Sequence, residues 1–197
     1  MKTFEETLNW RRSNYDLTPT IPFDDQTLET ILRENAEKAP SPFNMQNARL
    51  VLLLGEQHKK LWQIVKDTLR PIVNNEEAFQ QTEKKLDGFA NGYGTILYFH
   101  KNDVVKNMQE QVPAYAENFP RWGEHANGAL LYGTWLTLAS HGIAANIQHY
   151  NPLIDEDVKK TFHIDDTWEL IGQMPFGLPA SLPEPRTSVS DMLTVLK

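Results

Sequence analysis

Two adjacent arginines and a serine near the start of the chain form a residue set suited to binding phosphate. They are Arg11, Arg12 and Ser13, and Tyr15 follows two residues later. Guanidinium groups bind phosphate oxygens through paired, charge-assisted hydrogen bonds, and a serine hydroxyl adds a further donor. Exposed arginine pairs are common on protein surfaces, so on these residues alone a solvated helix end is the more frequent arrangement.

A proline-stiffened loop, Pro40–Gln46, carries amide side chains that could read a flat heterocycle. Its two prolines lower the conformational entropy that the loop loses on ordering. Asn44 and Gln46 each offer an amide donor and acceptor, which match a planar ring with alternating oxygen and nitrogen atoms along its edge. The same sequence is equally acceptable as a plain turn.

The segment Gly142–Pro152 joins a helix end to small residues and then to a polar cluster. Gly142 is a natural stop for the helical stretch before it. The small residues that follow would let a ring lie against the backbone, whose N–H groups could donate to a ring nitrogen. A core strand after a capped helix is an equally good interpretation.

The composition excludes several other kinds of site. The chain has no cysteine, so thiolate metal sites, disulfides and a cysteine nucleophile are excluded. Its six histidines show no metal-ligand spacing, and we expect no metal. No P-loop, GxSxG or GxGxxG motif is present. Gly92-Tyr-Gly94 is no dinucleotide-binding motif either, because it precedes a strand, whereas that motif follows one. A net charge of −7 argues against nucleic acid as a partner.

These residues must be positioned by a single domain spanning residues 1–197. A chain of 197 residues, 40% of them apolar, can bury one sizeable core but not two. No apolar run approaches the roughly 20 residues that span a bilayer. The first residues carry acids where a secretory signal has its apolar stretch, so we expect a cytoplasmic protein without a membrane partner.

Apolar spacing predicts helices around a small sheet, in an α+β or three-layer α/β/α arrangement. Thr3 and Glu6 have the spacing of a capping box, and Asp24 or Asp25 caps a second helix. The continuous apolar run Arg49–Leu54 suits a strand covered on both faces. Further expected elements are helices at Leu61–Leu69, Glu76–Leu86 and Tyr115–His141 and strands at Thr95–Phe99 and Thr167–Met174.

The end of the chain is predicted to lie away from the core. Pro175–Pro185 is punctuated by prolines and is expected to run across a surface as a loop. Met192–Leu196 alternates like a strand, and after a long surface loop it could pair far from its own core, for instance on a partner's sheet.

The three motifs occur in one order, and together they resemble the nitroreductase family of flavin mononucleotide (FMN) enzymes over essentially the whole chain. The short bacterial and fungal branch of that family also shows a strand similar to Gly92–Phe99 and a helix similar to Val112–Trp122. The resemblance implies a three-layer α/β/α fold with a mixed, mostly antiparallel sheet. It also implies an intertwined homodimer with two flavins at the interface.

The resemblance implies a flavin site divided between two chains. Arg11, Arg12 and Ser13 would hold the phosphate and the polar ring edge, with Tyr15 beside them, whereas the loop after the second helix would come from the other subunit. A lysine before the second strand would stabilise the reduced ring, and Lys85 matches this position, with Lys84 one step off. The other positions implied are Ser41, Pro42, Asn44 and Gln46 from the loop, and Ile147, Gln148 and His149 near the ring.

One departure from the family concerns the phosphate. The family commonly ends with an arginine that helps bind it, and the matching position here is Met192. Arg186, six residues earlier, is the candidate substitute. For the electron acceptor, the spacing of Tyr115, Phe119 and Trp122 predicts an aromatic pocket wall, with an ordinary core role equally open.

The implied function is transfer of two electrons from NAD(P)H through FMN to nitroaromatics, quinones or similar acceptors. A ping-pong hydride transfer is expected, with no side-chain acid or base as a catalytic residue. Two alternatives stay open from the sequence. One is a flavin-binding regulator of stress or lipid response with the same fold and no committed substrate. The other is an α/β binding module without flavin, in which the arginine pair is a surface feature.

Overall fold

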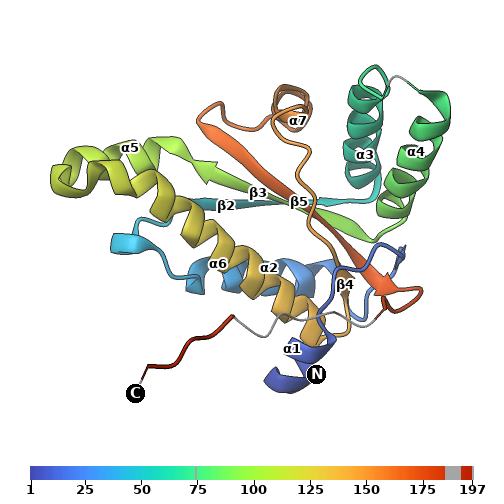
Figure 1. The fold of residues 1–197 in the computed structure, drawn as a ribbon, viewed down its shortest axis with the longest axis horizontal. Helices are drawn as coiled ribbons and strands as arrows, with labels where there is room; N and C mark the ends of the chain where they lie inside the picture. The colour runs from blue at the N-terminus through green and yellow to red at the C-terminus, as the bar shows by residue number, and fades with distance from the viewer. Residues whose placement is uncertain (74, 185–191, 197) are drawn as a thin grey trace.

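A sheet with helices on both faces organises the chain. The computed structural model describes residues 1–73, 75–184 and 192–196, and Figure 1 shows the arrangement of its elements. The helices are α1 (Phe4–Trp10), α2 (Asp25–Lys38), α3 (Gly55–Leu69), α4 (Glu76–Ala90), α5 (Asn102–Gln111), α6 (Phe119–Ser140) and α7 (Asp155–Phe162), with 3-10 turns η1 (Pro42–Asn44) and η2 (Pro113–Asn118). The strands are β1 (Leu17–Thr18), β2 (Ala48–Leu54), β3 (Gly94–Lys101), β4 (Ala144–Ala145) and β5 (Trp168–Pro179).

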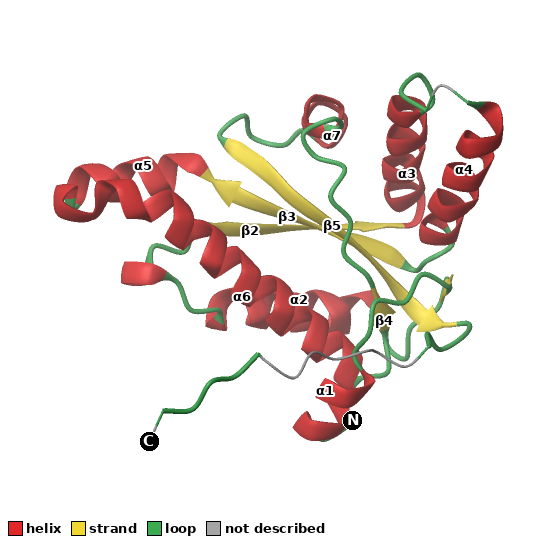
Figure 2. Cartoon of the chain, in the orientation of Figure 1, coloured by secondary structure: helices red, strands yellow, loops and turns green. Residues whose placement is uncertain are grey.

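The sheet runs in the order β1-β5-β3-β2, and β4 pairs with β5. Each of these strand pairs is antiparallel, whereas an isolated bridge between Ser13 and Ala145 is parallel. Helices α2 and α6 cover one face, and α3, α4 and α7 cover the other (Figure 2). The three-layer α/β/α prediction and the mostly antiparallel sheet are therefore confirmed.

Alternation along β3 divides the core into two layers. Ile96 and Tyr98 point into the cluster with α2 and α6, whereas Leu97 and Phe99 point into the cluster with α3, α4 and α7. All four side chains are fully buried. The apolar run Ile96–Phe99 suits a sheet covered on both faces, since successive side chains point to opposite sides.

Local signals fixed the first two helices as expected. Thr3 and Glu6 form the capping box at the start of α1, with each side chain bonded to the other residue's N–H. Asp24 is the residue that caps α2, through a 2.8 Å bond from the Thr27 N–H. In the described part of the chain, no helix has the length and apolar character that crossing a membrane requires.

Two expectations near the chain end differ from the structure. β5 continues through Pro175 to Pro179, and Phe176 is fully buried, so the predicted surface loop begins only after this strand. The prolines favoured a loop, but Phe176 packs into the α2–α6 layer of the core, and the segment is therefore part of the strand. Met192–Leu196 forms no strand within this chain and is exposed. Its predicted pairing on a partner's sheet stays a prediction.

The strand β2 lies at the edge of the sheet and is less covered than expected. All its residues except Leu53 keep some exposure. Leu50, Leu52 and Leu54 line an open groove of about 800 Å³ between β2 and α2. The described part of this chain therefore leaves one face of an apolar strand partly uncovered.

Candidate functional site

The segment that carries the arginine pair is fixed at both ends by backbone hydrogen bonds. Arg11 donates its N–H to the Thr7 carbonyl at 2.8 Å and ends α1. Asn14 donates its N–H to the Ala145 carbonyl at 3.1 Å, and the Asn146 side chain donates to the Asn14 carbonyl at 2.8 Å. The first and third sequence motifs therefore lie side by side.

Buried amide side chains hold the third motif against β5. Gln148 and Gln173 exchange two backbone hydrogen bonds of 2.8 and 2.9 Å, and the Gln148 side chain donates to Asn146 Oδ1 at 2.7 Å. The Gln173 carboxamide oxygen accepts from the Tyr150 N–H at 2.9 Å. Among described residues, no hydrogen bond involves the N–H of Ile147. The network therefore leaves a free donor beside the arginine segment.

Sequence reasoning named Gln148 but missed three other residues of this network. Asn14, Asn146 and Gln173 are at most 4% exposed, and each bonds to another chain segment. A glutamine inside the apolar run Thr167–Met174 was the available signal, because a buried amide needs partners.

Lys85 is brought to the same place from α4. Its Nζ lies 5.8 Å from the centre of the Tyr15 ring and 5.6 Å from that of Phe89, and these two rings are 5.9 Å apart. The structure therefore brings Lys85 beside Tyr15, two residues after the Arg11–Ser13 motif. Lys84, the neighbouring candidate, is exposed and makes no comparable ring contact in the described chain.

The cations gathered here lack carboxylate partners. Within the described residues, Arg11, Arg12 and Lys85 have no Asp or Glu oxygen within 4.0 Å, although the chain carries 26 acids against 19 lysines and arginines. By contrast, Lys66 pairs with Asp87, and Arg70 lies near Glu76 and Glu83. The Nε of Arg11 is buried with no hydrogen-bond partner among described residues. A group of cations without counter-ions fits an anionic ligand such as a phosphate.

The loop Ser41–Gln46 has a strained backbone. Phe43, Asn44 and Gln46 have φ angles of 53°, 53° and 51°, in the left-handed region that costs a non-glycine residue of order 1–3 kcal/mol. Ser41 Oγ accepts from the Gln46 N–H at 3.0 Å, and the Gln46 side chain donates to Asn44 Oδ1 at 3.2 Å. Such strain is typical of ligand-binding loops. Asn44 is of a residue type that tolerates a positive φ, whereas Phe43 gave no signal for it.

An aromatic cluster joins this loop to the start of α6. The ring of Phe43 lies 5.5 to 6.3 Å from those of Tyr115, Phe119 and Trp122. Phe119 is fully buried, so it supports the cluster from beneath and presents no surface. Tyr115 and Phe43 are about half exposed, and Trp122 is partly exposed. Phe43 is one of the exposed rings, although it was not among the site residues expected from the sequence.

The two groups of site residues lie apart in one chain. The loop contacts Trp122 near the start of α6, whereas Arg11 contacts Trp135 thirteen residues later. At 1.5 Å per residue, these contacts are roughly 20 Å apart along the helix. Figure 1 shows the loop with η1 at one end of α6 and the segment after α1 at the other. A single chain therefore does not bring the predicted halves together.

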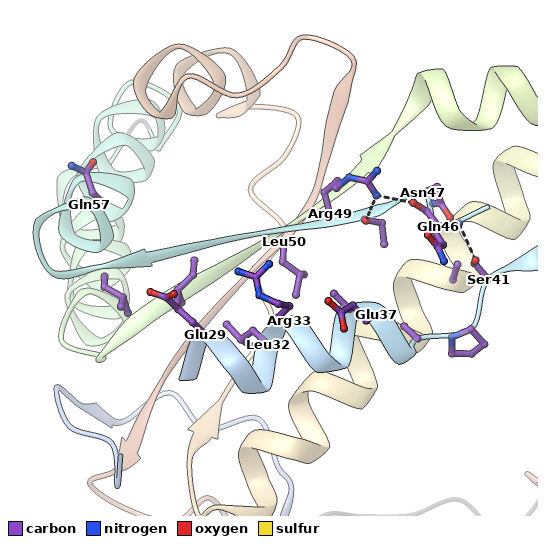
Figure 3. A pocket seen from close by; sticks show the side chains of 17 residues that line it. Glu29, Leu32, Arg33, Glu37, Ser41, Gln46, Asn47, Arg49, Leu50 and Gln57 are labelled. Carbon is purple, nitrogen blue, oxygen red and sulfur yellow. Dashed lines mark hydrogen bonds between the residues drawn. The ribbon is translucent and has the colours of Figure 1, made fainter. Parts of the chain in front are cut away.

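Ser41 and Gln46 also border the groove beside β2 (Figure 3). Arg49 donates to the carbonyls of Gln46 and Ala48 and so supports the end of the loop. Leu32 and Leu50 give the groove an apolar floor, and Arg33 and Glu37 lie on its α2 side. The loop is therefore continuous with the uncovered face of the edge strand.

Titratable groups near the third motif show no catalytic pair. The pKa of Tyr150 is raised to about 12, first by burial and then by the neighbouring Tyr15, so its hydroxyl stays protonated at neutral pH. No three His, Asp or Glu side chains gather as a metal site in residues 1–73, 75–184 and 192–196. Arg186, the predicted phosphate substitute, lies outside the described residues.

The chain is similar to known proteins over most of its length. The family model described as "Nitroreductase family" matches residues 8–178 of this chain. The nitroreductase FRM2 of Saccharomyces cerevisiae is 30% identical over 191 residues, which cover 94% of this chain and 92% of that protein.

Solved structures agree in fold. The nitroreductase CinD from Lactococcus lactis, solved in complex with 4-nitrophenol, is 38% identical with a TM-score of 0.88, covering 99% of this chain and 100% of that one. CinD has also been solved with chloramphenicol. A nitroreductase with bound FMN from Desulfitobacterium hafniense is 17% identical with a TM-score of 0.74, covering 100% of both chains.

Proposed function

This chain belongs to the nitroreductase family of oxidoreductases, and we propose that it is an FMN-dependent enzyme that passes electrons from NAD(P)H to nitroaromatics, quinones or similar acceptors. It acts in the cytoplasm as a homodimer, and its residues 1–197 form one flavin-binding domain.

The observation that carries the proposal is the buried guanidinium nitrogen of Arg11, which has no hydrogen-bond acceptor among the described residues. Arg12 follows Arg11 in the chain, and Lys85 lies beside Tyr15 of the same segment. An anionic ligand with a polar ring would pair with these cations and accept from the Ile147 N–H, which has no partner among the described residues. A flavin mononucleotide has both features.

The separation of the two proposed halves supports a homodimer. The strained loop lies roughly 20 Å along α6 from Arg11, so a complete site needs the loop of a second chain. The apolar edge of β2 and its groove offer the second chain a surface to cover. Met192–Leu196, exposed and without a partner strand among described residues, is the segment proposed to reach it.

FMN, when bound, would supply the two-electron chemistry that no side chain here can perform. Arg11, Arg12 and Ser13 would hold its phosphate and polar edge. Lys85 would place a positive charge near the ring, which favours the anionic reduced form. The partner's Ser41, Pro42, Asn44 and Gln46 would close the site, and Ile147, Gln148 and His149 would lie near the ring, with the Ile147 N–H as a donor that has no partner among the described residues.

The acceptor site is proposed to lie at the aromatic cluster. Tyr115 and Trp122 present partly exposed rings, and Phe119 supports them from the core. Planar acceptors stack well on such surfaces, since aromatic pairs gain about 0.5–1.5 kcal/mol beyond area burial. The 4-nitrophenol and chloramphenicol complexes of CinD, both nitroaromatic, support this acceptor class.

The proposal is tested by loading the purified protein with FMN and mixing it with NADH or NADPH and 4-nitrophenol or a quinone. Steady consumption of reduced nicotinamide is the expected result. A yellow protein that consumes none would instead support the regulator without a committed substrate. A protein that binds no flavin would contradict both.

A further inference from the structure

The side chain of Arg11 lies on two aromatic rings of α6. Its guanidinium carbon is 4.5 Å from the centre of the Trp135 ring and 5.9 Å from that of Tyr132. Tyr132 and Trp135 are three residues apart, so their rings share one face of the helix. Trp135 is 7% exposed and belongs to the core, whereas Tyr132 is 46% exposed. The arginine therefore covers the outer surface of a buried ring.

A guanidinium that lies on an aromatic ring keeps the N–H donors along its edge for another partner. Arg70 provides a comparison within this chain. It also lies on a ring, 4.1 Å from Phe79, but Glu76 and Glu83 are within 4.0 Å of its nitrogens. Arg11 has no such acid among the described residues, and its buried Nε lacks an acceptor. The aromatic rings of α6 therefore support a guanidinium that has no anionic partner among the described residues.

We propose that Trp135 and Tyr132 are positioning residues that hold Arg11 for the phosphate of the flavin. The inference rests on the proposed function and extends it to two residues that contact no part of the cofactor themselves. An arginine already fixed by its backbone and by a ring loses less conformational entropy when it binds an anion. This support strengthens the phosphate contact in a chain that has Met192 where the family commonly has an arginine.

The experiment compares FMN with riboflavin, which has the same ring and no phosphate. The ratio of the riboflavin Kd to the FMN Kd, measured by fluorescence quenching on apoprotein, reports the phosphate contribution alone. Trp135→Met removes the ring and keeps an apolar side chain of useful size. We expect it to lower the ratio about three- to tenfold, in line with a partly desolvated cation–π contact. The riboflavin Kd should stay unchanged.

Three further variants complete the test. Trp135→Phe keeps a ring and should retain most of the ratio. Tyr132→Leu, at a half-exposed position, should lower it about twofold, because this ring is the more distant one. Trp168→Met is the matched control, since Trp168 packs on Phe99 in the opposite layer, and it should leave the ratio unchanged.

Two results would overturn the inference. One is an unchanged ratio in both Trp135→Met and Tyr132→Leu. The other is an equal loss of FMN and riboflavin affinity, which would indicate a packing role. If Trp135→Met does not fold, Tyr132→Leu decides, because Tyr132 is 46% exposed and its ring can be removed without opening the core. A wild-type protein that binds neither flavin would instead contradict the proposed function itself.

Discussion

The ring of Phe43 stacks on the ring of Trp122, with centroids 6.3 Å apart and planes inclined by 19°. This contact ties the strained loop Ser41–Gln46 to the first turns of α6. Because the loop is proposed to complete the flavin site of the second chain, the aromatic cluster beside it would face that same flavin. Closure of the flavin site and selection of the acceptor would then both depend on the loop Ser41–Gln46.

Trp122 and Phe119 should respond differently to substitution. Trp122→Leu should change the preference among nitroaromatic and quinone acceptors, with the flavin spectrum and melting temperature nearly intact, because Trp122 is partly exposed. Phe119→Ala should destabilise the fold by roughly 3–5 kcal/mol, because this ring is fully buried. Acceptor kinetics and thermal melting check both. Equal loss of activity toward every acceptor in a stable Trp122→Leu protein would argue against a pocket role.

Arg12→Ala and Arg11→Ala should each weaken FMN binding roughly ten- to a hundredfold, since a charge-assisted contact contributes about 1.5–3 kcal/mol. The fold should persist, because the segment is held by backbone and amide hydrogen bonds. Arg70→Ala is the matched control, since Arg70 is exposed and near Glu76 and Glu83. Equal FMN affinity in all three variants would make the arginine pair a surface feature.

A buried histidine away from the site should make stability depend on pH. His58 is 2% exposed and lies 2.9 Å from Thr95 Oγ1 and 3.1 Å from the Ala90 carbonyl oxygen. Burial lowers the pKa of His58 from 6.5 to about 4. The unfolded chain therefore binds the proton more readily, and stability falls as the pH drops from 6.5 toward 4.

The expected loss between pH 7 and pH 4 is roughly 2–3 kcal/mol from this residue. Urea unfolding at several pH values measures it. His58→Gln removes the titrating group, so the variant should show a shallower pH dependence below 6.5. An identical pH profile in wild type and variant would show that other groups control acid stability.

Steady-state kinetics should follow a ping-pong pattern. NAD(P)H and the acceptor are proposed to use one face of the ring in turn, so both cannot be bound together. Initial-rate plots at several fixed acceptor concentrations should give parallel lines. Intersecting lines would require a complex that holds both substrates.

The sequence predicted those parts of the fold that local patterns control. The cap at Asp24, the apolar strand around Leu97 and the stop at Gly142 each act over a few residues, and the structure confirms them. The end of β5 was not predictable in this way, because pairing with β3 and packing of Phe176 outweigh the prolines around it. The helices α5 and α7 received no prediction.

Residue types in the sequence suggested the candidate site residues but not their geometry. The structure places Lys85 beside the Tyr15 ring. Asparagine tolerates a positive φ, so Asn44 carried a weak signal for it, whereas the residue type of Phe43 gives no signal for its positive φ. The contact between Arg11 and Trp135 joins residues far apart in sequence, and no spacing rule relates them.

The central claim is that each flavin site is shared between two chains, and mixing two defective variants tests it most directly. One variant carries Arg11→Ala with Arg12→Ala, and the other carries Asn44→Ala with Gln46→Ala. Each homodimer alone should bind little FMN. Random reassociation of a shared site should restore about a quarter of the wild-type sites, because half of the dimers are mixed and each has one intact site. If the site lies within one chain, the mixture will bind no more FMN than the separate variants.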